Sequence, residues 1–312
     1  MMTYRECADY LLRHDNYRIL THRNPDGDTL ASAGAFCQAL RRAGKTAWLF
    51  PNTGLTRKLR PYLEQLAEPE GFVPECTVSV DIATEGLFAE GFEGTVDLAI
   101  DHHPTNSHFA PDELVLPEKS ACGEIILELI QTLCGDVTPE EATLLYIAVT
   151  TDTGCFRYAN TNSDTFTAAS ELLRFGAKAH MVSETFFRKV SVARLKLEGM
   201  IYSNMSFYRD GKIVVSLITR DMLEKSGAGK DDFDDLAGLS GRVEGCDINV
   251  TIREQENGQS KASIRSRPGV SSIAIAEVFG GGGHELAAGC TIAASPEQAR
   301  DMLLAVINEQ LS

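Results

Sequence analysis

The chain has 312 residues, of which 43% are hydrophobic, and it carries a formal net charge of −15. This length and composition are sufficient for two globular domains, each with a core of its own. The negative charge disfavours a protein that holds long nucleic acid by its phosphates, because such binding needs a broad surface of Lys and Arg. Residues 1–20 carry charges where a signal peptide needs an apolar core, and no apolar run reaches about 18 residues, so we expect a cytoplasmic protein without membrane contact.

The first half of the chain predicts a parallel α/β domain. The sequence YRILTH at 17–22 is typical of a buried strand, and residues 29–45 carry apolar side chains at helical spacing until Gly44. Further strands are expected at 46–50, 76–83 and 96–101. Helices are expected at about 121–134, 139–151 and 163–175. Strands separated by helical or loop segments favour a parallel sheet, so functional side chains should gather at the carboxyl ends of the strands.

The pattern changes in the second half of the chain, which predicts a smaller α+β domain. We expect a first domain at 1–185, a charged helical linker at 186–203 and a second domain at 204–312. Strands are expected at 204–209, 212–219, 246–254 and 260–266, and helices at 272–279 and 296–311. The predicted fold class is therefore α/β, with a mainly parallel sheet flanked by helices and joined by the helical linker to the α+β domain.

The loop after the first strand, HRNPDGD, carries one imidazole and two carboxylates. Its tripeptide PDG is a strong turn sequence, and Asp28 is well placed to N-cap the helix that follows. The other interpretation is that His22, Asp26 and Asp28 converge on a divalent metal ion. The loop alone does not decide between a turn and a metal site.

Three further segments place acidic or imidazole side chains at the ends of strands or helices. Asp81 follows the strand TVSV, and Asp101, His102 and His103 follow VDLAI, so two strands deliver these groups to the same sheet edge. Asp152 ends an apolar helix, where its charge opposes the helix dipole and needs a compensating cation. Each residue alone could be a cap, part of a solvated turn or a satisfied core histidine. Their combination predicts a metal site.

These segments resemble the motifs of the DHH phosphoesterase superfamily. HRNPDGD, the aspartate of VSVD, IDHH and TDTGCFRY match its four motifs in order and approximate spacing, and GGGGHELAAG resembles the glycine-rich motif of its DHH-associated C-terminal domain. The resemblance covers nearly the whole chain. Its length and two-domain layout are similar to the bacterial nanoRNase and pAp phosphatase branch, which degrades very short RNA and removes phosphate from 3′-phosphoadenosine 5′-phosphate (pAp).

The resemblance implies a role for each matched residue. Six side chains would hold two divalent ions: His22, Asp26 and Asp81 the first, and Asp28, Asp81, His102 and Asp152 the second, with Asp81 bridging. His103 would act as the catalytic group that faces the substrate phosphate, and Asp101 would orient the histidines. Arg157 and Tyr158 would help to position the substrate.

The residue types support this metal chemistry independently of the family. Carboxylates and imidazoles suit hard or borderline ions, so we expect two Mn²⁺ ions, with Mg²⁺ as the alternative. The absence of cysteine from the set argues against structural zinc, and the eight cysteines contain no C-x-x-C pair. Two ions about 3.5–4 Å apart would bind a bridging water, make hydroxide available near neutral pH and clamp the phosphoryl oxygens during in-line attack.

The second domain offers candidate substrate contacts. Arg265 and Arg267 are separated by one residue, so on a strand both guanidiniums would lie on one face and could bind a terminal phosphate. A solvated strand face is the other interpretation. In GGGGH, Gly282 and Gly283 would let backbone N–H groups approach a phosphate beside His284, unless the segment is a flexible loop.

The sequence therefore predicts a two-metal phosphoesterase that hydrolyses short oligoribonucleotides such as pApA to mononucleotides and removes the 3′-phosphate of pAp, by attack of a metal-bridging hydroxide. The alternatives are an inorganic pyrophosphatase, a cyclic-dinucleotide phosphodiesterase and a non-catalytic nucleotide-binding module. Size and acidity disfavour a processive exonuclease for long single strands. The expected partners are short RNA and nucleotide phosphates, with no long nucleic acid, and a homodimer is left open.

Overall fold

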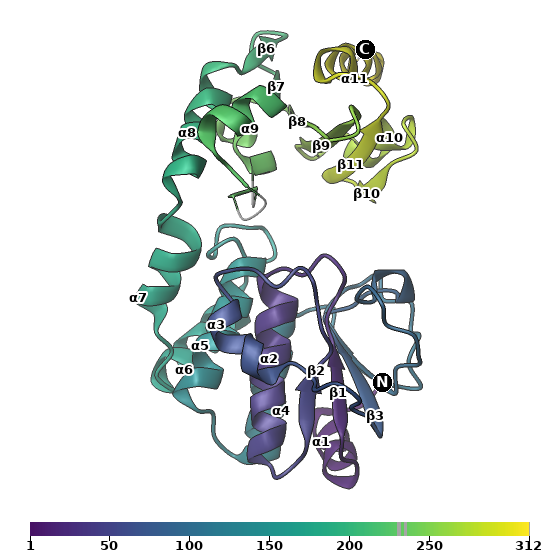
Figure 1. Ribbon diagram of the computed structural model, residues 1–312, viewed down its shortest axis with the longest axis vertical. Helices are drawn as coiled ribbons and strands as arrows, with labels where there is room; N and C mark the ends of the chain where they lie inside the picture. Colours follow the sequence, from purple (N-terminus) through teal and green to yellow (C-terminus); the bar gives the residue numbers. More distant parts are fainter. Residues whose placement is uncertain (230–231, 234–235, 312) are drawn as a thin grey trace. The chain divides into compact units, whose positions relative to one another are not determined.

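The chain folds into two compact units, Met1–Lys189 and Val190–Ser312, each with its own sheet and core (Figure 1). The computed structural model describes residues 1–229, 232–233 and 236–311, so Ser312, the last residue of the expected second domain, lies outside the described residues. The predicted α/β fold class is confirmed. Within the described ranges, every helix is too short or too polar to cross a membrane.

The first unit contains a five-stranded sheet in the order β2-β1-β3-β4-β5, and all of its neighbouring strands are parallel. The strands are β1 Tyr17–Leu20, β2 Ala47–Leu49, β3 Cys76–Val80, β4 Leu98–Asp101 and β5 Asp112–Val115. The sequence analysis missed β5, a short edge strand whose first half is polar and only partly buried. From β1 the chain adds β2 on one side, and it then crosses to add β3, β4 and β5 on the other side. Open α/β sheets bind ligands at such a switch point, here between β1 and β3, beyond the carboxyl ends of the strands.

Helices cover one face of this sheet. They are α1 Tyr4–Arg13, α2 Gly27–Arg42, α3 Arg60–Leu63, α4 Cys122–Cys134, α5 Pro139–Asp152, α6 Ser163–Arg174 and α7 Ala179–Val182. Ile19 and Val78 point into the core beneath the helices, whereas Leu20 points to the opposite face. That face is covered by loop phenylalanines, among which Phe88 packs edge-on against Phe92 with ring centroids 5.4 Å apart. Burial on both faces fixes the strand register, because a slip of one residue would exchange the side chains that face the helices with those that face the loop phenylalanines.

The second unit contains a six-stranded sheet in the order β10-β11-β9-β8-β7-β6, in which only β7 and β8 are parallel neighbours. The strands are β6 Ser206–Tyr208, β7 Ile213–Ile218, β8 Ile248–Glu254, β9 Ser260–Ser266, β10 Gly282–His284 and β11 Ala287–Ile292. Its helices are α8 Val192–Ser203, α9 Arg220–Ser226, α10 Ser272–Glu277 and α11 Pro296–Gln310. The sequence analysis did not identify β10, β11 or α9.

The segment predicted as a linker, 186–203, is divided by the boundary between the units, which falls after Lys189. Residues 186–188 are the end of a π-helix, Ser183–Arg188, and α8 follows it. Leu197 and Ile201 of α8 are fully buried and form a small core with residues of β7 and α9. This packing places α8 in the second unit.

The start of α4 lies very close to α5, because residue 123 is glycine. A Cβ atom added to Gly123 would lie 2.7 Å from the Cβ of Ala148 and 3.3 Å from the carbonyl oxygen of Leu145. Neither neighbour is a flexible side chain, so relief would require the two helices to move apart.

We therefore expect Gly123→Ala to lower the free energy of unfolding by about 1–3 kcal/mol, measured by urea denaturation without metal. Gly199→Ala is the matched control, because apart from its chain neighbours and the backbone of its own helix no described atom lies within 4 Å of its added Cβ. That variant should gain up to about 1 kcal/mol from helix propensity. An unchanged unfolding midpoint for Gly123→Ala would contradict the packing argument.

Candidate metal centre

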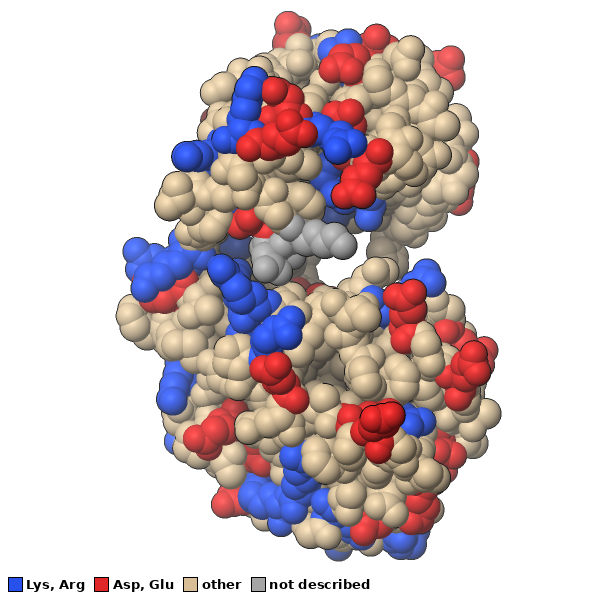
Figure 2. Space-filling view, viewed as in Figure 1, with Lys and Arg blue, Asp and Glu red and all other residues tan. Residues whose placement is uncertain are grey.

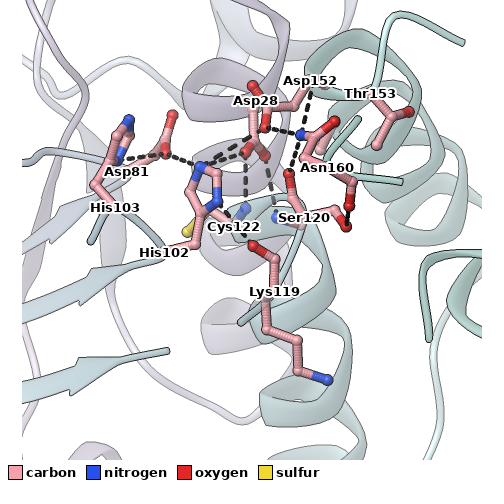
Figure 3. A network of polar contacts seen from close by, with 12 residues as sticks. Asp28, Asp81, His102, His103, Lys119, Ser120, Cys122, Asp152, Thr153 and Asn160 are labelled. Carbon is pink, nitrogen blue, oxygen red and sulfur yellow. Dashed lines mark hydrogen bonds and ion pairs between the residues drawn. The ribbon is translucent and has the colours of Figure 1, made fainter. Parts of the chain in front are cut away.

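The predicted site residues come together at the carboxyl edge of the parallel sheet. His22 follows β1, Asp81 directly follows β3, and Asp101 is the last residue of β4. Asp152 is the last residue of α5, and His102 follows Asp101 into the same region (Figure 3). Asp81 is not glycine yet has a φ of 62°, so the chain turns sharply where β3 ends and the expected strand 76–83 stops at Val80.

A first group consists of His22, Asp26 and Asp81, whose ligand atoms lie within 4.8 Å of one another. The Nε2 atom of His22 is 3.6 Å from Oδ2 of Asp26 and 3.9 Å from Oδ2 of Asp81. The Oδ1 atom of Asp26 accepts hydrogen bonds from the backbone N–H groups of Asp28 and Thr29, at 3.0 and 3.1 Å. Asp26 is therefore the N-cap of α2, and the expectation that Asp28 has this role was wrong.

A second group consists of Asp28, His102 and Asp152. The Nε2 atom of His102 is 3.8 Å from Oδ2 of Asp28 and 3.8 Å from Oδ2 of Asp152. The same nitrogen is 3.4 Å from Oδ1 of Asp81. One oxygen of Asp81 thus faces each group, which is the arrangement that a bridging ligand requires.

Asp28 has a structural role that the sequence analysis did not anticipate. Its Oδ2 accepts a hydrogen bond from the N–H of Cys122 at 2.7 Å, and its Oδ1 accepts from the N–H of Gly123 at 3.0 Å and from the hydroxyl of Ser32 at 2.9 Å. The N-cap residue of α4 is Ala121, whose methyl group cannot accept a hydrogen bond. Asp28, a residue of α2, therefore caps α4 from outside that helix.

Burial or the charges of neighbouring carboxylates raise the pKa of several groups in the site. Burial, followed by the charges of Asp81 and Asp152, raises the pKa of Asp28 well above its usual value. Burial also raises the pKa of Asp152 to about 6, despite the opposing effect of His102. Although burial alone would lower it, contact with Asp81 and the charges of the surrounding aspartates raise the pKa of His102 to about 10. Divalent cations would compensate the negative charge of these carboxylates in place of protons.

The residues present fit divalent metal ions. The Oδ1 atom of Asp81 is buried and has no hydrogen-bond partner among the residues that the structure describes. A buried carboxylate oxygen in this state is costly unless another group binds it. Oxygen and imidazole ligands without a thiolate suit Mn²⁺ or Mg²⁺.

His103 is held by Asp101 beside these groups. Oδ1 of Asp101 lies 2.7 Å from Nδ1 of His103 and accepts a hydrogen bond from the N–H of His102 at 2.8 Å. Its Oδ2 accepts from the side-chain amide of Asn106 at 2.6 Å. The orienting arrangement is therefore Asn106, Asp101 and His103, with Nε2 of His103 left for other contacts. Sequence reasoning missed Asn106, because an asparagine three residues after a histidine follows no recognised pattern.

The residues after Asp152 form a strained loop. Gly154, Cys155 and Phe156 have φ values of 55°, 58° and 62°, and a non-glycine residue rarely adopts this conformation. The ring of Tyr158 occupies the space that a Cβ of Gly154 would need, and Nε of Arg157 donates to the carbonyl of Gly154 at 2.5 Å. Arg157 and Tyr158, the predicted substrate residues, are both exposed. The conformation of this loop determines where they lie after Asp152.

The two arginines predicted as a pair in the second unit have different surroundings. Arg265 lies in β9 and is exposed, with Nη1 donating to the carbonyl of Ile264 at 3.1 Å. Arg267 lies beyond the end of β9, and its Nε donates to Asp247 at 2.6 Å. The guanidinium of Arg267 is therefore already paired, so it is not equivalent to that of Arg265.

The glycine-rich segment is an exposed strand, β10, which pairs antiparallel with β11. A Cβ at Gly281 would lie 2.3 Å from the carbonyl oxygen of Gly289, and one at Gly283 would lie 2.6 Å from that of Ala287. Strand packing thus explains these two glycines. At Gly282 the added Cβ would be more than 4 Å from every described residue except its two chain neighbours, so space alone does not explain this glycine.

Comparisons with known proteins find relatives of both units. The family model described as the DHH family, N-terminal domain, matches residues 16–149, and the DHHA1 domain matches residues 210–312. The bifunctional oligoribonuclease and PAP phosphatase NrnA of Thermus thermophilus is 37% identical over 302 residues, covering 94% of this chain and 90% of that protein. The Bacillus subtilis protein of the same description is 26% identical, covering 89% and 90%.

One solved structure shares the fold over nearly the whole chain. It is an exopolyphosphatase-related protein from Bacteroides fragilis, with a TM-score of 0.88 and 23% identity, covering 98% of this chain and 96% of that one.

The two aspartates of the NPDGD loop should respond differently to the same substitution. Asp28→Asn loses one of two carboxylate oxygens that both accept backbone N–H groups, so it should lower the free energy of unfolding by about 1–3 kcal/mol. Asp26→Asn keeps the single oxygen that caps α2, so its loss in the free energy of unfolding should be only a few tenths of the loss in Asp28→Asn. Thermal or urea unfolding with a chelator present measures this contribution apart from metal binding. Equal stability of the two variants would refute the capping of α4 by Asp28.

Proposed function

The chain belongs to the DHH family of phosphoesterases, and on that premise we propose that it hydrolyses short oligoribonucleotides to mononucleotides and removes the 3′-phosphate of pAp. DHH phosphoesterases depend on divalent metal ions, and this chain has acidic and histidine groups that can bind them. The observation that carries the proposal is the meeting of four aspartates and two histidines in two groups, with one oxygen of Asp81 facing each.

We propose two ions for each chain, Mn²⁺ as the first choice and Mg²⁺ as the alternative. His22, Asp26 and Asp81 would hold one of them. The other would be held by Asp28, Asp81, His102 and Asp152. When bound, the ions supply Lewis-acid activation of water and neutralise charge on the phosphoryl oxygens.

His103 is the best placed general acid in this proposal. Asp101 fixes its Nδ1 at 2.7 Å, and Asn106 fixes Asp101, so the ring keeps one orientation while Nε2 stays free to donate a proton. The His103 side chain is 36% exposed, which leaves it accessible to a substrate. Its proton would pass to the leaving oxygen as the P–O bond breaks. Arg157 and Tyr158 would contact the substrate from the strained loop after Asp152.

A short substrate agrees with the charge of the molecule. Acidic and basic side chains are interspersed on the face of both units shown in Figure 2, rather than gathered into one broad basic surface there. With a net charge of −15, long polyanions would be repelled, whereas a few phosphates can be met by local groups. We propose Arg265 and the strand Gly282–His284 as those local groups in the second unit, with Arg267 in a supporting position.

The central test is hydrolysis of pApA and pAp by purified protein with Mn²⁺, with pyrophosphate and cyclic di-AMP as competing substrates. Asp81→Asn should lose more than about a hundredfold in turnover and bind both ions less tightly, because changes to groups outside the metal shell already cost about 10–100-fold. Asp97→Asn is the control, since Asp97 lies at the other end of the sheet and accepts a hydrogen bond from the N–H of Thr77. Preferential turnover of pyrophosphate or cyclic di-AMP would replace the proposed substrate class.

Binding and chemistry should separate in the second unit. Arg265→Ala should raise KM for pApA several-fold while hydrolysis of bis-p-nitrophenyl phosphate, a small ester without a further phosphate, stays near the wild-type rate. Lys261→Ala removes another exposed cation of β9 and should change neither substrate. Arg265 has no separate binding role if its variant impairs both substrates equally.

A further inference from the structure

One short segment of the chain contacts two members of the second metal group directly and the third through Asn160. The segment is 119–123, which leads into α4. Its Cys122 and Gly123 N–H groups bind Asp28, as described above. The carbonyl of Lys119 lies 3.1 Å from Nδ1 of His102, so that nitrogen donates its proton there and the ring is oriented with Nε2 toward the carboxylates.

The third member, Asp152, is reached through Asn160. The side-chain amide nitrogen of Asn160 donates to the carbonyl of Ser120 at 3.1 Å, to the carbonyl of Asp152 at 3.2 Å and to Oδ2 of Asp152 at 3.4 Å (Figure 3). The hydroxyl of Ser120 donates back to the carbonyl of Asn160 at 2.5 Å. Asn160 therefore joins the end of α5 to the segment that also contacts Asp28 and His102.

The oxygen of Asp152 that Asn160 contacts is the one that faces the metal group. Oδ2 lies 3.8 Å from Nε2 of His102, and the Asp152 side chain is 28% exposed, so packing restrains it less than it restrains the buried Asp28. At a helix C-terminus the carboxylate also gains nothing from the helix dipole. In the described part of the chain, the side-chain amide of Asn160 is the hydrogen-bond donor to this carboxylate.

We propose that Asn160 is a positioning residue of the second metal site, where it orients the Asp152 carboxylate while Ser120 holds Asn160 in place. This inference rests on the proposed metal-dependent function. Asn160 is itself exposed and lies in a loop, so its side chain contributes little to any core. Its contacts are instead concentrated on one proposed ligand and on the segment 119–123.

The chain offers a matched comparison two residues away. Asn162 lies in the same loop and also contacts Ser120, whose hydroxyl accepts from its amide at 3.3 Å. Its main contacts are those of the α6 N-cap, because its side-chain oxygen accepts from the N–H groups of Asp164 and Thr165. Asn162→Ser keeps a capping oxygen and removes only the amide. The two asparagines therefore separate support of the loop from orientation of Asp152.

The test is a titration of metal-free protein with Mn²⁺, in which electron paramagnetic resonance measures the free ion. Asn160→Ala should weaken the binding of one Mn²⁺ by about tenfold or more and leave the other unchanged, the usual effect of removing a group that orients a metal ligand. Asn162→Ser should bind both ions like the wild type. Wild-type affinity for both ions in Asn160→Ala, or an equal loss in Asn162→Ser, would overturn the proposal.

A second readout separates positioning from general damage. If Asn160 acts through Asp152, the Mn²⁺ concentration for half-maximal hydrolysis should rise by a similar factor in Asn160→Ala, and kcat should return toward the wild-type value at saturating Mn²⁺. A kcat that stays low with unchanged metal dependence would speak against the inference. Because metal binding is measured directly, a protein that binds Mn²⁺ as expected but cleaves neither pApA nor pAp would refute the proposed function alone.

Discussion

Repulsion among carboxylates at one edge of the sheet is the constraint that shapes the first unit. Asp28, Asp81 and Asp101 are each at most 2% exposed, and burial of negative charge is unfavourable unless donors or cations surround it. The fold supplies different hydrogen-bond donors to Asp28 and to Asp101. Asp28 accepts hydrogen bonds from the first N–H groups of α4, and Asp101 accepts them from the side chain of Asn106 and the backbone N–H of His102. Asp81, whose Oδ1 has no hydrogen-bond partner among the described residues and lies 3.4 Å from Nε2 of His102, depends most on nearby positive charge.

This constraint links parts of the molecule that are distant in sequence. The close approach of α4 to α5 at Gly123 places the N–H groups of α4 where Asp28 can bind them. The segment that precedes α4 then meets His102 and, through Asn160, Asp152. The sheet topology determines which strand ends meet, and the position of α4 determines how three of the proposed ligands are oriented.

Local signals in the sequence were enough to predict the parallel sheet, the main helices and the residues that meet at its edge, because strand patterns and acidic or imidazole side chains occur in single segments. Contacts between segments were not predictable in this way. The pattern of NPDGD does not reveal that Asp26 caps α2 while Asp28 caps α4. Arg267 looked free because its partner Asp247 lies 20 positions away. The strands β10 and β11 were missed because glycine and alanine lack the side chains that mark a strand.

The backbone at Asp81 has a consequence for how the sequence can change over time. Asp81 combines a left-handed φ of 62° with a buried oxygen that has no hydrogen-bond partner among the described residues. Glycine would relieve both features, since it adopts this conformation freely and carries no charge. Selection for stability and selection for activity therefore oppose each other at this position. A gene copy released from the need for hydrolysis would gain stability by losing this aspartate, so substitution there would be an early sign that a descendant had changed its role.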